Sequence, residues 1–200
     1  MKISKKKFIY LISPNNIYPR FYQDLKEVLK TVKISFFQLR LKKYTLKQKI
    51  LIGKKIRLIC KKNSVKFLVN DDPLLAKKLD ADGCHLGQKD MSISNARKIV
   101  GNKIIGITCH NSIKFAKAAI KEKASYIAFG ALFSTTTKKV KFKATTKILN
   151  KAKKLTKIPI VAIGGINISN YKKLLLNNAN LLAISGYVWN NKKYKPLETI

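Results

Sequence analysis

An acidic pair in a very basic chain is the first feature that could do chemistry. The stretch FLVNDD, residues 67–72, ends an apolar run on an amide and two carboxylates, in a chain with only 9 acidic residues against 43 basic ones. Adjacent like charges disfavour each other, so the pair predicts a bound cation or a strongly basic ligand. Asp72 precedes Pro73 and suits the N-cap of a helix that begins there, which leaves Asp71 for binding.

A basic segment lies a short distance upstream, in QLRLK at residues 38–42. In an extended strand, alternate side chains point to opposite faces. Gln38, Arg40 and Lys42 therefore share one face, while Leu39 and Leu41 share the other with Phe37. We expect the apolar face to pack against helices and the polar face to carry function.

A second carboxylate follows the next apolar run, where HLGQKD (85–90) ends on Asp90. Oxygen ligands beside arginine and lysine form a mixed-charge site of the sort that holds Mg²⁺ together with a diphosphate. We therefore predict Asp71 and Asp90 as Mg²⁺ ligands, next to Arg40 and Lys42.

Two further segments could bind phosphate. FSTTTKKVKFK, from residue 133, has three consecutive threonines followed by Lys138, although such a loop alone is a weak signal. The glycine pair Gly164–Gly165 and the segment Ile184–Gly186 end the last two apolar runs, and they could offer backbone N–H groups to a phosphate. The glycine pair could equally serve a tight turn.

The elements that would position these residues are short apolar runs alternating with helical patterns along the whole chain. Ser112 and Ser169 are expected to cap two of the helices. Eight runs, without a GxGxxG after the first, favour a closed (β/α)8 TIM barrel, formed by residues 1–200 as one domain, whose last helix is short or missing. The runs span residues 7–13, 35–41, 66–71, 83–87, 103–109, 126–132, 159–166 and 181–188.

The barrel fixes where function should lie, because active sites of this fold form at the carboxyl ends of the strands. All the polar groups above follow or end a predicted strand. An exposed edge strand could also carry the polar face of Gln38, Arg40 and Lys42, but a closed barrel has no edges. We therefore expect that face to point into the barrel mouth.

Composition excludes several classes of protein. The apolar run near the N-terminus is about five residues, where a secretion signal needs roughly seven to fifteen, and no run approaches the roughly 20 residues of a transmembrane helix. Cys60, Cys84 and Cys109 form no CxxC pair, so neither a disulfide framework nor a zinc site is indicated. We expect a cytoplasmic protein that does not associate with membranes.

The formal net charge of +34 suggests nucleic acid, but the kinds of residue argue against specific binding. Arginine, which reads bases and phosphates in bidentate fashion, occurs only at positions 20, 40, 57 and 97. The lysines are spread through every predicted helix. We interpret them as solvent-exposed positions and predict no specific nucleic-acid partner.

The chain has two histidines, His85 and His110. His85 lies within a predicted strand and is expected to be a hydrogen-bonded residue of the barrel rather than a base. His110 follows the next predicted strand and could reach the mouth. It forms no convincing dyad with Cys109, since neighbouring strand residues point to opposite faces.

Taken in order, these motifs resemble the thiamine-phosphate synthase family, a (β/α)8 transferase family of vitamin B1 synthesis. From about residue 35 to 188 the chain has QLRLK for the family's QLRxK, then VNDD, HLGQKD, GITCH for GVSxH, STTTK for PTxTK, IGGI, and IS after the eighth strand. The resemblance implies an enzyme that condenses hydroxymethylpyrimidine diphosphate with a hydroxyethylthiazole phosphate, by way of a pyrimidine-methyl cation, with Mg²⁺ as cofactor.

The resemblance also implies roles for individual residues, with Arg40, Asn70 and Lys138 as the catalytic groups and Asp71 and Asp90 as the metal ligands. The pyrimidine diphosphate would be held by Gln38, Leu39, Arg40, Leu41, Lys42, Asn70, Thr108 and Lys138. The thiazole phosphate would be held by Thr135, Thr136, Thr137, Gly165, Ile184 and Ser185.

The chain departs from the family pattern at Leu41, where QLREK is usual, and at Ala131 and Ser134, where GPxFPT has prolines. Two alternatives stay open. A thiazole tautomerase of the same fold would use His110 as its acid-base group and would need no diphosphate site. A basic barrel that binds nucleic acid or another ligand without catalysis would not depend on Asp71.

Overall fold

A computed structural model describes residues 8–31, 33–135 and 142–200 of the chain. The described residues form eight parallel strands, and β1 pairs with both β2 and β8, so the sheet closes into a barrel with the strands in chain order. The strands are β1 Ile9–Ile12, β2 Ile34–Leu39, β3 Lys66–Asn70, β4 Gly83–Leu86, β5 Ile104–His110, β6 Tyr126–Phe129, β7 Ile160–Ile163 and β8 Leu181–Ile184. The predicted (β/α)8 fold is confirmed.

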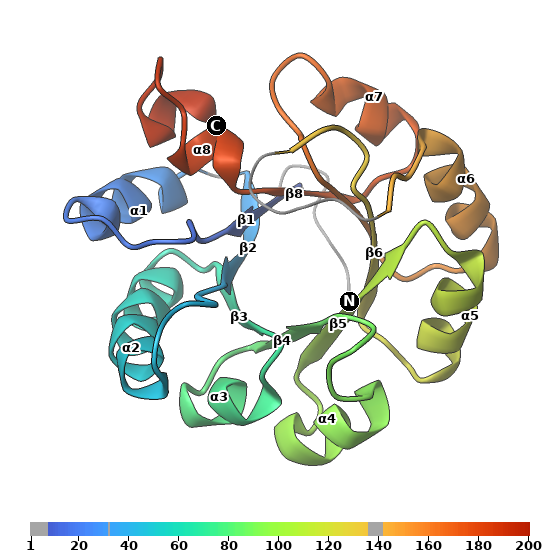
Figure 1. Ribbon diagram of the computed structural model, residues 1–200, viewed down its shortest axis with the longest axis horizontal. Coiled ribbons are helices and arrows are strands. Elements are labelled where there is room, and N and C mark those ends of the chain that lie inside the picture. Colours follow the sequence, from blue (N-terminus) through green and yellow to red (C-terminus); the bar gives the residue numbers. More distant parts are fainter. Residues whose placement is uncertain (1–7, 32, 136–141) are drawn as a thin grey trace.

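Helices surround this ring of strands, each following its strand in the chain (Figure 1). The predicted shortening of the last helix is confirmed, because α8 has four residues and only a four-residue 3-10 helix, η1, comes after it. The helices are α1 Phe21–Leu29, α2 Leu46–Lys62, α3 Pro73–Lys78, α4 Ile93–Val100, α5 Ile113–Lys121, α6 Thr146–Leu155, α7 Tyr171–Leu176, α8 Gly186–Trp189 and η1 Pro196–Thr199.

Side-chain caps explain where several helices begin. Thr45 and Gln48 form a reciprocal capping box at the start of α2, and the Asp72 carboxylate accepts from the Leu75 N–H at the start of α3. Ser112 caps α5 as predicted, by accepting from the Phe115 N–H. These short-range bonds satisfy N–H groups that the first turn of a helix leaves without a partner.

The prediction that Ser169 caps α7 is wrong. The helix begins at Tyr171, with Asn170 in the cap position, and the Ser169 hydroxyl instead donates to Asn167 Oδ1 at 2.7 Å. The side chain of Asn170 also bonds backward, accepting from the Asn167 N–H and donating to the Gly165 carbonyl. The loop before α7 therefore uses these polar side chains to hold its own backbone.

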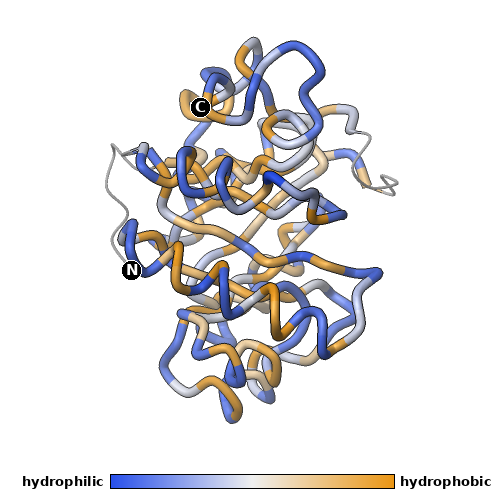
Figure 2. The backbone as a smooth tube through the Cα atoms, turned by 90° about the vertical axis from the view of Figure 1, so that its left-hand side faces the viewer, coloured by the Kyte–Doolittle hydropathy of each residue, from blue (hydrophilic) through white to orange (hydrophobic). Residues whose placement is uncertain are grey.

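Apolar side chains form two separate clusters, one inside the barrel and one between the strands and the helices. The inner cluster is small and contains Tyr10, Phe36, Leu68 and Tyr126. The outer one is larger, and it includes Leu39 and Leu41. Along the outer helices, hydrophobic and hydrophilic residues alternate (Figure 2), as expected for helices with one face on the barrel.

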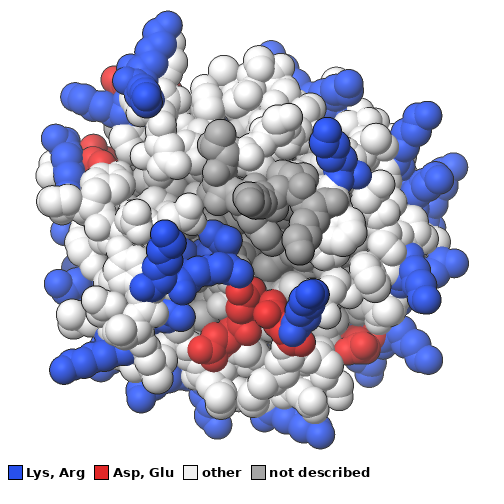
Figure 3. Space-filling model, viewed as in Figure 1, with Lys and Arg blue, Asp and Glu red and all other residues white. Residues whose placement is uncertain are grey.

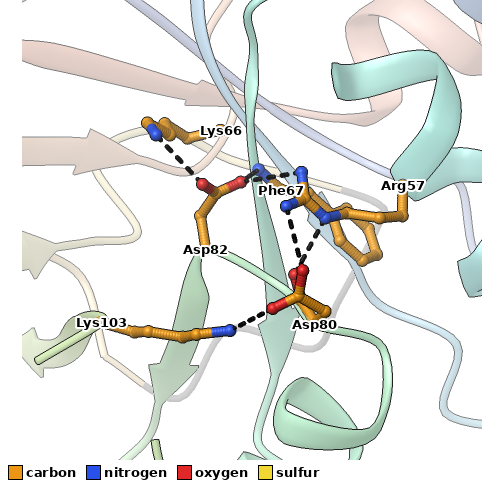
Figure 4. Close-up of polar contacts among 6 residues, drawn as sticks. All are labelled: Arg57, Lys66, Phe67, Asp80, Asp82 and Lys103. Carbon is orange, nitrogen blue, oxygen red and sulfur yellow. Dashed lines mark hydrogen bonds and ion pairs between the residues drawn. The ribbon is translucent and has the colours of Figure 1, made fainter. Parts of the chain in front are cut away.

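The amino ends of the strands carry an ion-pair network (Figure 4). Asp82, just before β4, accepts from the Phe67 N–H at 2.9 Å, from Lys66 Nζ at 3.0 Å and from Arg57 Nη1 at 3.3 Å. Asp80 pairs with Lys103 Nζ at 2.6 Å and with Arg57. In this fold, features at the amino ends of the strands serve stability.

Candidate active site

The predicted mixed-charge site forms at the carboxyl ends of β2, β3 and β4. Lys42 Nζ lies 3.2 Å from Asp71 Oδ2, and the carboxylates of Asp71 and Asp90 are close enough to interact. Figure 3 shows a group of acidic side chains near the middle of one end of the barrel, bordered by lysine and arginine. Residues that are 48 positions apart in the chain, from Lys42 to Asp90, are thus brought together by neighbouring strands.

The electrostatics of the pair follow from its crowding. Partial burial and the neighbouring Asp71 carboxylate raise the pKa of Asp90, while the Gly87 N–H, which donates to Asp90 at 2.7 Å, acts in the opposite direction. Partial burial also lowers the pKa of Arg40, and Asp71 opposes that change. Two carboxylates held together beside cations are a poor arrangement for stability alone, but a good one for binding a cation or an anion with its counterion.

The two acidic side chains of the NDD motif have separate tasks. Asp72 turns away as the cap of α3, as predicted, whereas Asp71 has a left-handed backbone with φ of 64° and directs its side chain to Lys42. Its N–H donates to the His85 carbonyl at 2.8 Å, which anchors the turn on β4. Aspartate adopts this conformation more readily than most residues do.

Arg40 is held by the loop that follows β1. The buried Ser13 hydroxyl accepts from the Arg40 N–H at 2.9 Å and donates to the Arg40 carbonyl at 3.3 Å. Asn15 Oδ1 accepts from Arg40 Nη1 at 2.9 Å. The guanidinium is thereby oriented before any ligand arrives.

The QLRLK run divides as its alternation predicts. Gln38 faces the interior of the barrel, where it donates to Tyr10 and is almost fully buried. The side chains of Leu39 and Leu41 lie in the outer apolar cluster, away from the mouth. Any contact that these two leucines make with a substrate would therefore use main-chain atoms.

The strands next to the acidic pair carry two further residues that the sequence motifs predict for pyrimidine binding. Asn70 ends β3, is partly buried, and lies opposite His85 of β4 in the strand register. Thr108 of β5 is partly buried and bonds to His85 Nε2 at 2.8 Å. His85 is thus a hydrogen-bonded barrel residue, as predicted, while His110 ends β5 with its ring 4.4 Å from that of Phe142.

The predicted thiazole-phosphate residues are described only in part. Thr135 is half-exposed after β6, whereas Thr136, Thr137 and Lys138 lie outside the described residues. Ile184 ends β8, and the Ser185 hydroxyl donates to the Ser13 carbonyl at 3.1 Å, which joins β8 to β1 at the mouth.

The backbone conformation after β7 explains why two glycines occur there. Gly164 and Gly165 have φ of 103° and 64°, a region that favours glycine. A Cβ on Gly165 would lie 2.2 Å from the Ser134 carbonyl oxygen. The pair therefore makes the tight turn that the sequence left open, packed against the loop after β6.

Sequence reasoning missed the residues that support the site from β1 and β6. Ser13 and Asn15 hold Arg40, and Tyr10 and Tyr126 bond to Gln38 and His85. The signal for Ser13 and Asn15 is weak but present, since they follow the first strand and so belong to the mouth. Nothing in the local pattern distinguishes the two tyrosines from ordinary core aromatics.

A metal would have few side-chain ligands here. Across residues 8–31, 33–135 and 142–200, no group of three or more His, Cys, Asp and Glu side chains could hold an ion. Two adjacent carboxylates do fit Mg²⁺, which commonly binds one or two carboxylates and completes its shell with water and substrate phosphates. In the same described part of the chain, no helix has the length and apolar character needed to cross a membrane.

A closed (β/α)8 barrel with charged groups gathered at the carboxyl ends of its strands has the architecture of a barrel enzyme. The family model described as thiamine monophosphate synthase matches residues 9–188. The chain is 68% identical over 196 residues to the thiamine-phosphate synthase of Pelagibacter ubique (strain HTCC1062), covering 98% of this chain and 95% of that protein. It is 37% identical over 185 residues to that of Rhodospirillum centenum (strain ATCC 51521 / SW), covering 92% and 89%.

A solved structure, the thiamine phosphate pyrophosphorylase from Pyrococcus furiosus, superposes with a TM-score of 0.85 at 30% identity, covering 98% of this chain and 92% of that one. The chain therefore belongs to the thiamine-phosphate synthase family and is an enzyme, a transferase. The resemblance read from the order of the sequence motifs is confirmed.

Proposed function

We propose that this enzyme joins hydroxymethylpyrimidine diphosphate to hydroxyethylthiazole phosphate, giving thiamine phosphate and free diphosphate. The observation that carries the proposal is the junction of Arg40 and Lys42 with Asp71 and Asp90 at one mouth of the barrel. Family membership supplies the reaction class. The geometry supports a diphosphate at this end, because cations and a carboxylate pair together suit a metal-bound polyanion.

In the proposed reaction, the bond between the pyrimidine methyl carbon and the diphosphate oxygen breaks, and the electron pair leaves with diphosphate. The thiazole nitrogen then attacks the pyrimidine-methyl cation through its lone pair. Arg40, preoriented by Asn15, and Lys42 stabilise the charge on the departing group. Lys138, which follows β6 in the chain, would add a third cation.

Asp71 and Asp90 would hold Mg²⁺ in this site. When bound, the ion would neutralise negative charge on the diphosphate and so make it a better leaving group. Asn70, Gln38 and Thr108 would orient the pyrimidine, and Thr135, Thr136, Thr137, Gly165, Ile184 and Ser185 the thiazole phosphate. Three free and buried thiols, Cys60, Cys84 and Cys109, support placing the enzyme in the reducing cytoplasm.

The test is formation of thiamine phosphate and diphosphate by purified protein given both substrates, with Mg²⁺ or with a chelator. We expect product only with the metal, and a rate about 10²- to 10³-fold lower in Asp71→Asn, the size of effect seen when one preorganised electrostatic group is lost. Asp80→Asn is the matched control, since Asp80 is also an ion-paired aspartate but lies at the opposite end of the barrel.

Three outcomes would contradict the proposal. Equal rates with and without chelator would show that the reaction does not require Mg²⁺. Isomerisation of a thiazole carboxylate phosphate without coupling would favour the tautomerase. Nucleic-acid binding that falls steeply with salt, with no coupling and no effect of Asp71→Asn, would favour a basic binding protein.

A further inference from the structure

Inside the barrel, polar side chains from five different strands form one continuous chain of hydrogen bonds. Gln38 Nε2 donates to the Tyr10 hydroxyl, and the Tyr10 and Tyr126 hydroxyl oxygens lie 2.7 Å apart. The Tyr126 hydroxyl is 2.8 Å from His85 Nδ1, and His85 Nε2 is 2.8 Å from Thr108 Oγ1. The chain thus connects Gln38 to Thr108, two groups of the proposed pyrimidine site.

Tyr10 and Tyr126 lie in an apolar environment, where a hydroxyl group is unfavourable unless it has a hydrogen-bond partner. Tyr10 is 1% exposed and Tyr126 is fully buried, among the side chains of the inner cluster. Phenylalanine would fill the same space without a polar atom that requires a partner. The ring of Tyr126 also needs a glycine beside it, because a Cβ on Gly106 would lie 1.9 Å from Cζ of Tyr126.

The direction of the hydrogen bonds follows from counting protons. Burial raises the pKa of both phenols, so each keeps its one proton. Gln38 Nε2 only donates, so Tyr10 accepts from it, and the order that also gives the Tyr10 proton an acceptor in this chain of bonds has Tyr10 donating to Tyr126. Tyr126 then gives its proton to the next acceptor in the chain, His85 Nδ1.

The imidazole of His85 connects Tyr126 to Thr108. A ring nitrogen that accepts carries no proton, so neutral His85 has its proton on Nε2 and donates it to Thr108 Oγ1. An imidazolium would leave the Tyr126 proton without its acceptor. The Thr108 hydroxyl already accepts from His85, so its own proton is directed to an acceptor outside this chain of bonds.

We propose that Tyr10 and Tyr126 are positioning residues that hold His85 as the Nε2–H tautomer and thereby orient the Thr108 hydroxyl as a hydrogen-bond donor toward the pyrimidine substrate. The part concerning the substrate rests on the proposed function. The part concerning the tautomer does not. The acceptor on the ligand would be a pyrimidine ring nitrogen or a diphosphate oxygen, and the proton order excludes a ligand N–H as the partner of that hydroxyl proton.

The tautomer can be measured without any activity. The chain has two histidines, so nitrogen-15 NMR of the imidazoles at neutral pH, with His110→Gln for assignment, resolves Nδ1 and Nε2 of His85. We expect an unprotonated Nδ1 and a protonated Nε2 in the wild type, and loss of this single state in Tyr126→Phe. Tyr22→Phe, on α1 outside the barrel, should leave the signals unchanged. A protonated Nδ1 in the wild type would overturn the assigned order.

Kinetics tests the link to the substrate. We expect kcat/KM for the pyrimidine diphosphate to fall about tenfold in Tyr126→Phe and in Tyr10→Phe, the effect of one lost or misdirected hydrogen bond, with KM for the thiazole phosphate unchanged. If Tyr126 acts through Thr108, Tyr126→Phe should have no further effect in a Thr108→Val background. Additive losses, or equal losses for both substrates, would overturn the positioning role. Absence of synthase activity would overturn the proposed function and leave the NMR result to decide the tautomer.

Discussion

Asp82 offers a test of how the amino end of the barrel is stabilised. Its side chain is 17% exposed and its carboxylate joins three groups, the Phe67 N–H, Lys66 and Arg57, whereas the side chain of Asp80, in the same network, is 83% exposed (Figure 4). Phe67, the second residue of β3, is fully buried. Replacing Asp82 by alanine therefore leaves a buried donor without its partner.

The expected cost follows from these contacts. Leaving a buried N–H unpaired costs about 1–3 kcal/mol, and each partly exposed ion pair adds about 0.2–1 kcal/mol. We expect Asp82→Ala to lower the free energy of unfolding by about 2–4 kcal/mol. Asp82→Asn keeps an oxygen acceptor for the Phe67 N–H and should lose only about 1 kcal/mol.

Asp80→Asn is the matched control, since the Asp80 side chain is itself 83% exposed and, among the contacts of this network, pairs only with Lys103 and Arg57. Asparagine also tolerates the left-handed backbone at this position, where φ is 47°. We expect a loss below about 1 kcal/mol, which disappears in high salt because exposed pairs are screened.

Urea unfolding is the appropriate assay, because urea is uncharged and does not screen a chain of net charge +34 as guanidinium would. With a slope near 2 kcal/mol per molar, Asp82→Ala should move the midpoint down by roughly 1–2 M. Equal destabilisation by Asp82→Ala and Asp80→Asn would refute the reasoning, since it would mean that leaving the buried Phe67 N–H unpaired does not lower the free energy of unfolding.

Three further predictions concern other parts of the barrel. Ser13→Ala removes the acceptor of the Arg40 N–H, so steady-state kinetics should show a higher KM for the pyrimidine diphosphate and urea unfolding a loss of about 1–3 kcal/mol; unchanged values for both would contradict the anchoring role. In Gly83→Ala, a Cβ would lie 1.9 Å from the Ile104 carbonyl oxygen, so the β4–β5 pairing should break and unfolding should occur at lower urea than in any variant above. Burial raises the pKa of Cys84 and of Cys109 from 9.0 to about 12, so their contribution to stability is complete below pH 9 and is lost as the pH rises from 9 toward 12. A disulfide reagent at pH 8 should label these thiols only in urea, and rapid labelling of the native protein would contradict their burial.

Much of the fold could be predicted from the sequence because its signals are local. Alternating apolar runs and helical patterns gave all eight strands, and Asp72 and Ser112 were correctly identified as caps from the residues beside them. The ends of the strands were predicted less closely than the strands themselves. The eighth apolar run continues to residue 188, but β8 ends at Ile184 and Gly186–Trp189 form α8, since a run of apolar residues does not distinguish a strand from a buried helix.

The candidate site was predictable where the fold rule sufficed. Once the runs are strands of a barrel, their carboxyl ends must meet, and so Lys42, Asp71 and Asp90 come together. The sequence by itself determined these groups, and the alternation in QLRLK determined which side chains of that run face away from the outer apolar cluster. Only the tertiary structure decided which contacts support them, because Ser13 meets Arg40 across 27 positions and Tyr10 meets Tyr126 across 116. Such bonds depend on closure of the barrel and on the space left at Gly106, and neither periodicity nor capping, which act within a few residues, can specify them.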